Sequence, residues 1–393
     1  MTGKPHSGSE FSLLAGGPTH WLQQRLGLIK PGAPNLWRRA VLCVLVTWVP
    51  LLVLSAAEGL AFGHRVKLPF LHDFAGYTRF LFAVPLLILA EGFVERRVKD
   101  AAEHFITSGL VPESNYSRYE AAIESCKALR DSIVAECVVL AVAAIGVVLV
   151  MREFSFDFST WRSIVSDSVH TRTAAGWWYL IVANGLFQFL SWRWVWRLVI
   201  WYRFLWLMSK LDLRVIPTHP DRSAGLGFIG DTQRMFWGIV VAVSAAAAAV
   251  LANEVVYAGV PLKGYQFAIA GYAVVMLFVF LAPLLMFTPQ LVEAKDKSLR
   301  EYGSLAVAHN HMFHRKWVHG ENPGADPVLG TPEISSLADL GAAYDILAEM
   351  RAVPFDPADA IVLVLSALVP MAPLLLTIMP LAKLLELMSK LLV

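Results

Sequence analysis

The chain has 393 residues, of which 56% are hydrophobic and only 16% are charged, whereas an average soluble domain is about a quarter charged. This balance and a mean hydropathy of +0.55 argue against a soluble enzyme, and they exclude a mainly disordered chain because so much apolar surface must be buried. The 33 Lys and Arg nearly equal the 31 Asp and Glu, so no nucleic-acid partner is expected. The three cysteines form no CxxC pair, and neither a disulfide framework nor a metal knuckle is predicted.

Residues 1–40 form a polar arm that contains Pro and Gly. The apolar run after it is full length and lacks a small-residue cleavage site, so it is expected to remain as a membrane span and not to act as a signal peptide. Within the arm, Leu22, Leu26 and Ile29 fall on one face of a helix. This pattern predicts either a short helix on the membrane surface or a disordered tail.

Seven apolar segments are long enough to cross a bilayer core of about 30 Å, which takes about 20 helical residues. They run over 41–62, 76–95, 132–151, 175–192, 235–256, 265–292 and 358–382. In lipid each backbone group must be satisfied within its own segment, and the alternation typical of a barrel strand is absent, so helices are favoured. The predicted fold is all-α, a polytopic transmembrane helix bundle of about seven spans with helical cytoplasmic extensions.

Lys and Arg are distributed unequally between alternate connections. The arm and the segments 96–131, 191–234 and 293–357 hold 24 of the 33, and the alternating flanks hold the other 9, counting Arg79. Because basic residues concentrate on the cytoplasmic side, the N-terminus is predicted to be cytoplasmic and the C-terminus external. Three prolines interrupt the last span, which either crosses the membrane or re-enters, and re-entry would leave the C-terminus in the cytoplasm.

The predicted organisation follows from these spans. A cytoplasmic arm (1–40) precedes a membrane domain (41–292), which carries a helical cytoplasmic hairpin (96–131) and a loop rich in Gly (210–234). A cytoplasmic helical connection (293–357) leads to the last span and an amphipathic C-terminal tail (358–393). Both helical cytoplasmic segments, 96–131 and 293–357, are candidates for binding a protein partner.

Six acidic residues fall within the predicted spans, where ionisable groups are costly and often functional. They are Glu58, Glu91, Glu95, Glu136, Glu254 and Asp359. None lies near the middle of its span. They are either functional groups of the spans, or interfacial groups that reach water, or residues of helices that extend beyond the membrane.

The stretch from Trp177 to Trp206 holds seven of the 13 Trp and also Arg193 and Arg197, which are one helical turn apart. Like charges at this spacing repel unless something neutralises them. The stretch is therefore either an aromatic belt with snorkelling arginines or part of an acid–arginine network that lines a cytoplasmic vestibule. The candidates for a transport path are Glu91, Glu136, Asn184, Gln188, Arg193 and Arg197, with the two glutamates as cation or proton sites.

The loop Leu213–Asp231 reads LRVIPTHPDRSAGLGFIGD and contains a literal GxGxxG. The dinucleotide interpretation fails, because that motif needs a βαβ unit and here a membrane span follows. Glycine-rich backbone at the start of a helix exposes N–H groups that favour an anion. The candidates for an anion-binding loop are His219, Asp221, Arg222, Gly225 and Gly227; the alternative is a tight connection between helices.

Other motifs give few indications of chemistry. Four histidines lie within 309–319, but their basic neighbours disfavour a cation, and no metal site or cofactor is predicted. Neither a GxSxG elbow nor a P-loop occurs, so no catalytic residue is identified, and ATP-driven transport by this chain alone is disfavoured.

Two cytoplasmic motifs carry a resemblance. THPDRSAGLGFIGD (218–231) and LGTPEISSLADL (329–340), the second followed by MRAVPF (350–355), are similar to a family of uncharacterised bacterial polytopic inner-membrane proteins. The family has a Gly where this chain has Ala224, and Asp-Ile-Gln-Ser where this chain has 333–336. The resemblance implies a bacterial inner (plasma) membrane location and no activity.

Three classes of function remain. The favoured one is a channel or secondary transporter for a small ion or solute. The alternatives are a sensor or scaffold subunit that binds a partner, and a membrane-embedded enzyme that acts on a lipid or a phosphate-bearing substrate. The expected partners are the lipid bilayer, a cytoplasmic protein and further copies of the chain in a homo-oligomer.

Overall fold

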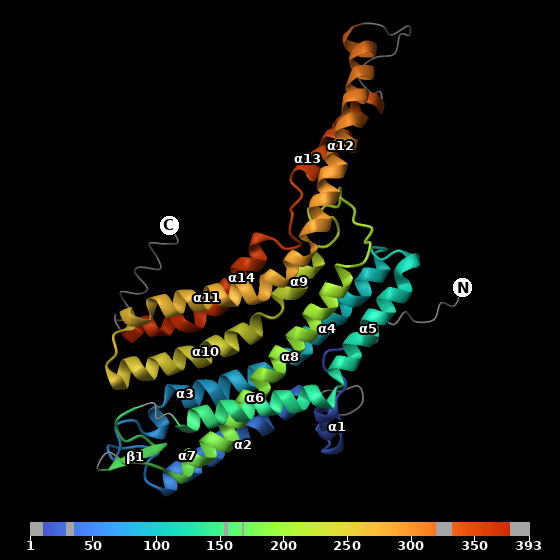
Figure 1. The fold of residues 1–393 in the computed structure, drawn as a ribbon. Coiled ribbons are helices and arrows are strands. Elements are labelled where there is room, and N and C mark those ends of the chain that lie inside the picture. The colour runs from blue at the N-terminus through green and yellow to red at the C-terminus, as the bar shows by residue number, and fades with distance from the viewer. Residues whose placement is uncertain (1–10, 29–34, 153–155, 167–168, 320–331, 378–393) are drawn as a thin grey trace.

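The computed structural model describes residues 11–28, 35–152, 156–166, 169–319 and 332–377. The structure is 76% helical, which confirms the all-α class. Figure 1 shows an elongated bundle, from one end of which a pair of helices projects. The predicted C-terminal tail beyond residue 377 lies outside the described residues.

The body of the bundle consists of long helices that lie roughly side by side (Figure 1). They are α2 (Leu36–Ala57), α4 (Val84–Thr107), α6 (Ile133–Arg152), α8 (Asn184–Met208), α10 (Trp237–Asn253), α11 (Gln266–Leu281) and α14 (Pro357–Leu368). Six helical stretches in the described part of the chain are long and apolar enough to cross a membrane. The chain is therefore a multi-pass membrane protein.

The predicted span 175–192 differs from the other six. It forms the beginning of a continuous helical stretch, α7 (Ala174–Trp178) through α8, which packs against α2 and α6. This stretch is not among the six apolar ones, because its Asn, Gln, Arg and Trp residues lower its hydropathy. Of the body helices named above, α8 is the one that lacks an apolar window of membrane-spanning length.

One end of the bundle carries the only β-strands in the described residues. β1 (Ser163–Ser166) and β2 (Val169–Arg172) form an antiparallel hairpin, which was not predicted from the sequence. The Thr173 side chain accepts a hydrogen bond from the Gly176 amide and so caps α7. A Cβ at Gly176 would lie 2.1 Å from the Arg162 carbonyl oxygen, so only glycine allows α7 to approach the hairpin this closely. We call this side the hairpin end.

The opposite end, which we call the stalk end, carries the helical extensions. They are α5 (Tyr116–Arg130), the short α9 (Phe228–Arg234), α12 (Thr288–Phe313) and α13 (Pro332–Ala348). α12 continues from α11 and packs against α13, and this pair forms the projecting stalk (Figure 1). The basic segments that were predicted to share one side of the membrane thus gather at one end.

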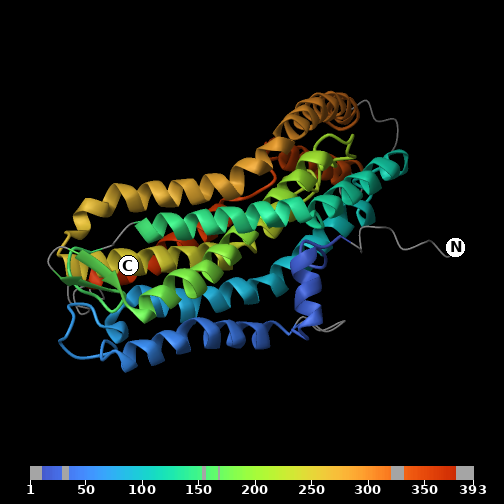
Figure 2. The ribbon, with the colours of Figure 1, turned by 60° about the horizontal axis from the view of Figure 1, so that its bottom comes forward.

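The N-terminal segment also lies at the stalk end. Its helix α1 (Pro18–Arg25) crosses the end of the bundle instead of running along it (Figure 2). Residues 11–13, which precede α1, are buried, and the Phe11 ring stacks on Phe204 of α8 with 4.8 Å between ring centroids. This segment is part of the packed structure, so the alternative of a disordered tail is wrong for residues 11–28.

The last helix begins and ends as its sequence dictates. The Asp356 side chain accepts from the Asp359 amide and the Asp359 side chain accepts from the Asp356 amide, forming a capping box that satisfies free N–H groups of the first turn. The α-helix ends at Leu368, since Pro370 has no N–H to continue the α-helical hydrogen bonds. The chain then continues as a 3-10 helix to Thr377.

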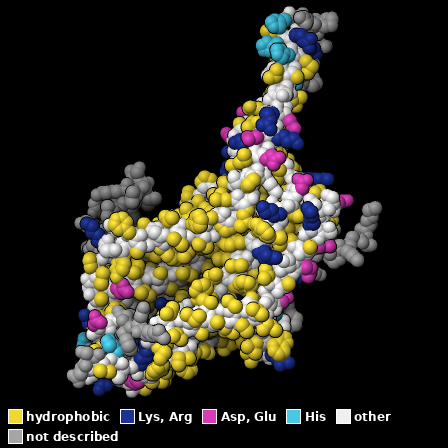
Figure 3. Space-filling view, viewed as in Figure 1, with side chains coloured by type: hydrophobic (Ala, Val, Ile, Leu, Met, Phe, Trp, Pro, Cys, Tyr) yellow, Lys and Arg dark blue, Asp and Glu magenta, His cyan; other side chains and the backbone are white. Residues whose placement is uncertain are grey.

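The outer surface of the body is apolar. Only 17% of the apolar window in Ile133–Met151 is buried, and large side chains of this helix such as Val134 and Ile145 are exposed. Figure 3 shows a broad hydrophobic band over the body, with charged side chains gathered towards its ends and on the stalk. A soluble monomer rarely exposes an apolar patch of this extent, whereas a bilayer covers it.

Candidate functional site

A cavity of about 190 Å³ lies inside the bundle next to the hairpin end. It is bounded by α3 (Phe74–Tyr77) and the turn after it, by α8, by the end of α10 and by the loop that leads to β1. Its polar lining residues are Arg79, Arg162, Tyr179, Asn184, Gln188, Asn253 and Glu254, and apolar side chains complete the wall. Two sequence-predicted candidates, Asn184 and Gln188, thus line one cavity.

Three helices that bound this cavity are locally widened. π-helical turns run over Thr78–Ala83, Tyr179–Ala183 and Glu254–Ala258, and each contributes a lining residue to the cavity. A π-turn shifts the helix register by one residue and is common at functional sites. The widened turns bring Arg79, Tyr179 and Glu254 to one place.

Asp73 braces one side of this region. Its buried carboxylate accepts hydrogen bonds from Asn253 at 2.6 Å and from the indole N–H of Trp161 at 2.9 Å. It also accepts from the amides of Ala75 and Gly76 and so caps α3. These bonds join α3, α10 and the segment before the hairpin, so Asp73 fixes the walls and has little capacity left for a ligand.

Two donors that line the cavity are not fully used. Arg79 donates from Nη1 to the Tyr179 phenol oxygen at 2.5 Å and lies over the Phe187 ring, but its buried Nε–H has no hydrogen-bond partner in the described residues. Asn184 is 3% exposed, and its Nδ2 also lacks a described partner. Unsatisfied buried donors are rare and costly, so a ligand or ordered water is expected here.

A second polar cluster lies nearer the stalk end. Glu91 of α4 is held between two arginines, with Oε2 at 2.5 Å from Arg39 Nη1 and Oε1 at 2.8 Å from Arg197 Nη2. All three side chains are buried. Arg193 lies close enough for its guanidinium to interact electrostatically with these charges. Its Nη1 is buried without a hydrogen-bond partner among the described residues. The cluster carries more positive than negative charge.

The two polar pairs of α8 do not form one stripe. Asn184 lines the hairpin-end cavity, whereas Arg197 contacts Glu91 of α4, to which Arg39 of α2 also bonds. Arg193 follows Asn184 by nine residues, which is about two and a half turns of an α-helix. The two pairs therefore lie on opposite sides of α8 and point to different neighbours. α8 connects two separate polar sites on different faces.

Each of the six acids in the predicted spans already has a protein partner. Glu91 pairs with two arginines, while the others accept from a backbone amide or a phenol. The donors are the Ala174 amide for Glu58, the Leu13 amide for Glu95, the Thr19 amide for Glu136, the Tyr265 hydroxyl for Glu254 and the Asp356 amide for Asp359. These carboxylates hold structural elements together.

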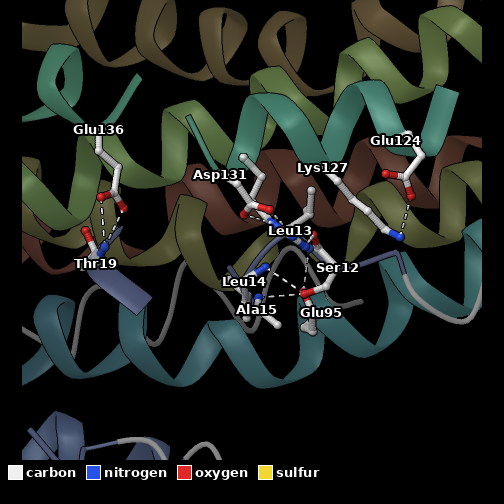
Figure 4. Close-up of polar contacts among 11 residues, drawn as sticks. Ser12, Leu13, Leu14, Ala15, Thr19, Glu95, Glu124, Lys127, Asp131 and Glu136 are labelled. Carbon is white, nitrogen blue, oxygen red and sulfur yellow. Dashed lines mark hydrogen bonds and ion pairs between the residues drawn. The ribbon is translucent and has the colours of Figure 1, made fainter. Parts of the chain in front are cut away.

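Two of these acids bind the N-terminal segment. Figure 4 shows the Glu136 carboxylate at the amide of Thr19, 2.9 Å away, and Glu95 at the amide of Leu13, 3.0 Å away. Arg130 of α5 donates to the Ser12 carbonyl oxygen at 2.9 Å. Glu136 thus lies at the N-terminus of α1, where a negative charge is stabilised, and this predicted transport candidate fastens the segment that crosses the stalk end.

The glycine-rich loop binds a carboxylate of its own. Asp221 accepts N–H groups from Ser223, Gly225 and Gly227 at 2.8–3.1 Å. Burial by itself raises the pKa of Asp221, but these three amides and His219 outweigh it and lower the pKa below its usual value. Three of the N–H groups that could bind an external anion therefore already bind the Asp221 carboxylate.

The loop is also tied to the segment before α14. Arg351 donates from Nη2 to the Asp221 carbonyl oxygen at 2.8 Å, and its amide donates to the Arg222 carbonyl oxygen at 2.7 Å. Arg222 forms an exposed ion pair with Glu349. Ala224 is buried with φ at +55°, a region that favours glycine. The loop 218–231 and the segment 350–355 thus meet in space.

Sequence reasoning located part of these sites. It singled out Glu91, Arg193 and Arg197, which lie together, but it treated Arg79 as a flanking charge. Arg79 is the only basic residue in the predicted span 76–95, and an arginine inside a span is a signal in its own right. Arg162 and Asp73 lie outside the predicted spans, and no local pattern indicated them.

No family model, no curated protein and no solved structure matches this chain.

Proposed function

We propose that this membrane protein is a channel or secondary transporter for a small ion or solute, which is held in the hairpin-end cavity. The observation that carries the proposal is a cavity inside the membrane body whose lining includes two arginines, three side-chain amides and unsatisfied donors. Packing of apolar helices does not require such groups, and polar residues at this depth commonly mark a substrate path.

The stalk end is covered, unlike the hairpin end with its cavity, and this difference supports the proposal. There the N-terminal segment lies across the bundle, and the amide of Thr19 and that of Leu13 are bound by carboxylates of α6 and α4. His20 of α1 lies within electrostatic reach of Arg193 and Arg39. A polar cavity near one end and a covered cluster at the other are expected of one closed state of a channel or carrier.

Flux measurement tests this function directly. Purified protein in liposomes is offered gradients of H⁺, K⁺, Cl⁻, phosphate, acetate and glycine, and we expect uptake of at least one of them above protein-free liposomes. Gln188→Leu removes a lining amide next to α6 and is expected to lower that uptake at least tenfold. Glu124→Gln on the exposed face of α5 is the matched control and should leave it unchanged. Folded protein that carries none of these solutes would refute the proposal.

A further inference from the structure

We infer that the hairpin-end cavity binds the anionic group of a small solute, a carboxylate or another oxyanion, through Arg79 and Asn184. That the bound solute is the transported substrate rests on the proposed function. The binding itself follows from the donors of the cavity.

Arg79 provides the charge for this site. No carboxylate among the described residues lies within ion-pair distance of its guanidinium, which contacts only a phenol oxygen and aromatic rings. Arg79 is half-buried and its Nε–H is shielded from solvent, and a charge removed from water is costly unless it is paired. A carboxylate or oxyanion is the partner that suits a guanidinium best, because it accepts two parallel N–H bonds.

Asn184 provides the second donor from a different helix. It is almost fully buried, lines the same cavity, and its Nδ2 has no described acceptor. Both unsatisfied atoms are donors, so the missing partner must be an acceptor. A metal cation does not meet this requirement, because cations bind to acceptors.

The other charges around the cavity limit the ligand. Arg162 lies 3.9 Å from Asp73, whose carboxylate is already bonded to Trp161 and Asn253. Glu254 also lines the cavity, and one of its oxygens accepts from the Tyr265 hydroxyl. A solute that carries an ammonium group as well as a carboxylate would use Glu254 in addition. The volume of about 190 Å³ suits a molecule of a few heavy atoms and is below the usual range for drug-sized ligands.

The experiment measures binding separately from transport. Full-length protein in neutral detergent is titrated with acetate, phosphate, chloride and glycine at constant ionic strength, and the thermal midpoint is followed by tryptophan fluorescence. We expect a saturable rise for acetate, phosphate or glycine. Arg79→Gln and Asn184→Asp are each expected to weaken this binding at least tenfold, while Arg65→Gln, an exposed arginine at the same end, should change it less than twofold.

Two further arms keep the result interpretable. Arg79→Lys retains the charge and should retain measurable binding, and the midpoint without ligand shows whether each variant is folded. If the group comes from a lipid, phosphatidylglycerol produces the Arg79-dependent rise and free phosphate does not, which still supports an oxyanion site. A saturable rise with K⁺ or Na⁺ alone, or binding that survives both Arg79→Gln and Asn184→Asp, overturns the inference. Flux without anion binding would support the proposed function and refute this inference. Anion binding without flux would support this inference and refute the proposed function.

Discussion

Two arginine sites in the membrane body differ in what neutralises them. At the stalk end Arg39 and Arg197 enclose Glu91, with N–O distances of 2.5 and 2.8 Å. At the hairpin end Arg79 donates to the Tyr179 hydroxyl, and no carboxylate pairs with it within the described residues. A charged side chain inside the membrane body therefore does not by itself identify a binding site. A guanidinium with its own carboxylate holds helices together, whereas Arg79 has none among the described residues and lines a cavity that a ligand can enter.

The largest expected effect tests the paired site. Glu91→Gln leaves two buried guanidiniums without a counter-charge, which costs about 3–5 kcal/mol when one partner of a buried pair is removed. We expect a large fall in the thermal midpoint and in the yield of folded protein in detergent. Glu124→Gln removes one partner of an exposed pair with Lys127 and should give no measurable change. Equal midpoints for the two variants would contradict the structural role of Glu91.

A carboxylate held by neutral amides is the next comparison. Asp221→Ala removes the acceptor of three backbone N–H groups, and we expect roughly 2 kcal/mol of local destabilisation. Hydrogen exchange at residues 223–227 should then be roughly 30 times faster, while exchange in α10 stays unchanged. Asp221→Asn keeps one acceptor oxygen and should show a smaller increase. Unchanged exchange in Asp221→Ala would refute this role.

A smaller effect is expected where a carboxylate binds the N-terminal segment. Glu136→Gln keeps an acceptor for the Thr19 amide but removes the negative charge at the N-terminus of α1, an interaction of about 0.5–1 kcal/mol. Hydrogen exchange across 18–25 should increase about threefold. If the segment closes the stalk end, solute flux through the variant should rise as well. Cys137→Ser, which changes an exposed neighbour of Glu136 on α6, is the control and should leave both measurements unchanged.

The smallest effect is a dependence on pH. Burial first, and then Arg193, Arg39 and Arg130, lower the pKa of His20 below 6.5, and the opposing effect of Glu91 is weaker. The ring also contacts Gln24 at 3.0 Å. Because the docked state disfavours the protonated ring, docking of α1 is stabilised above pH 6.5 and weakens as the pH falls through that value. Limited proteolysis of residues 11–28 should be faster at pH 5.5 than at pH 7.5, and His20→Gln should remove the difference.

The roles of individual acids show where sequence reasoning reached its limit. Glu136 was a candidate proton site because it is a carboxylate in a span, but its partner is an amide 117 residues earlier in the chain. Arg79 received no role, although its Nε–H has no hydrogen-bond partner among the residues that the structure describes. Both facts depend on which helices are neighbours. The pattern of one segment does not contain that information.

The sequence by itself determined that the chain is an all-α, multi-pass membrane protein, and it placed the span at 235–256 within a few residues of α10. It also placed the break in the last span at its prolines. These properties follow from hydropathy, length and backbone hydrogen bonding, which are local. Only the tertiary structure decided which charges are paired, because partners such as Arg39 and Glu91 lie 52 residues apart. A charge that is paired within the protein has a structural role, whereas an unpaired charge in a cavity can bind a ligand. The reason is that removing a charge from water is costly unless a partner compensates for the lost hydration.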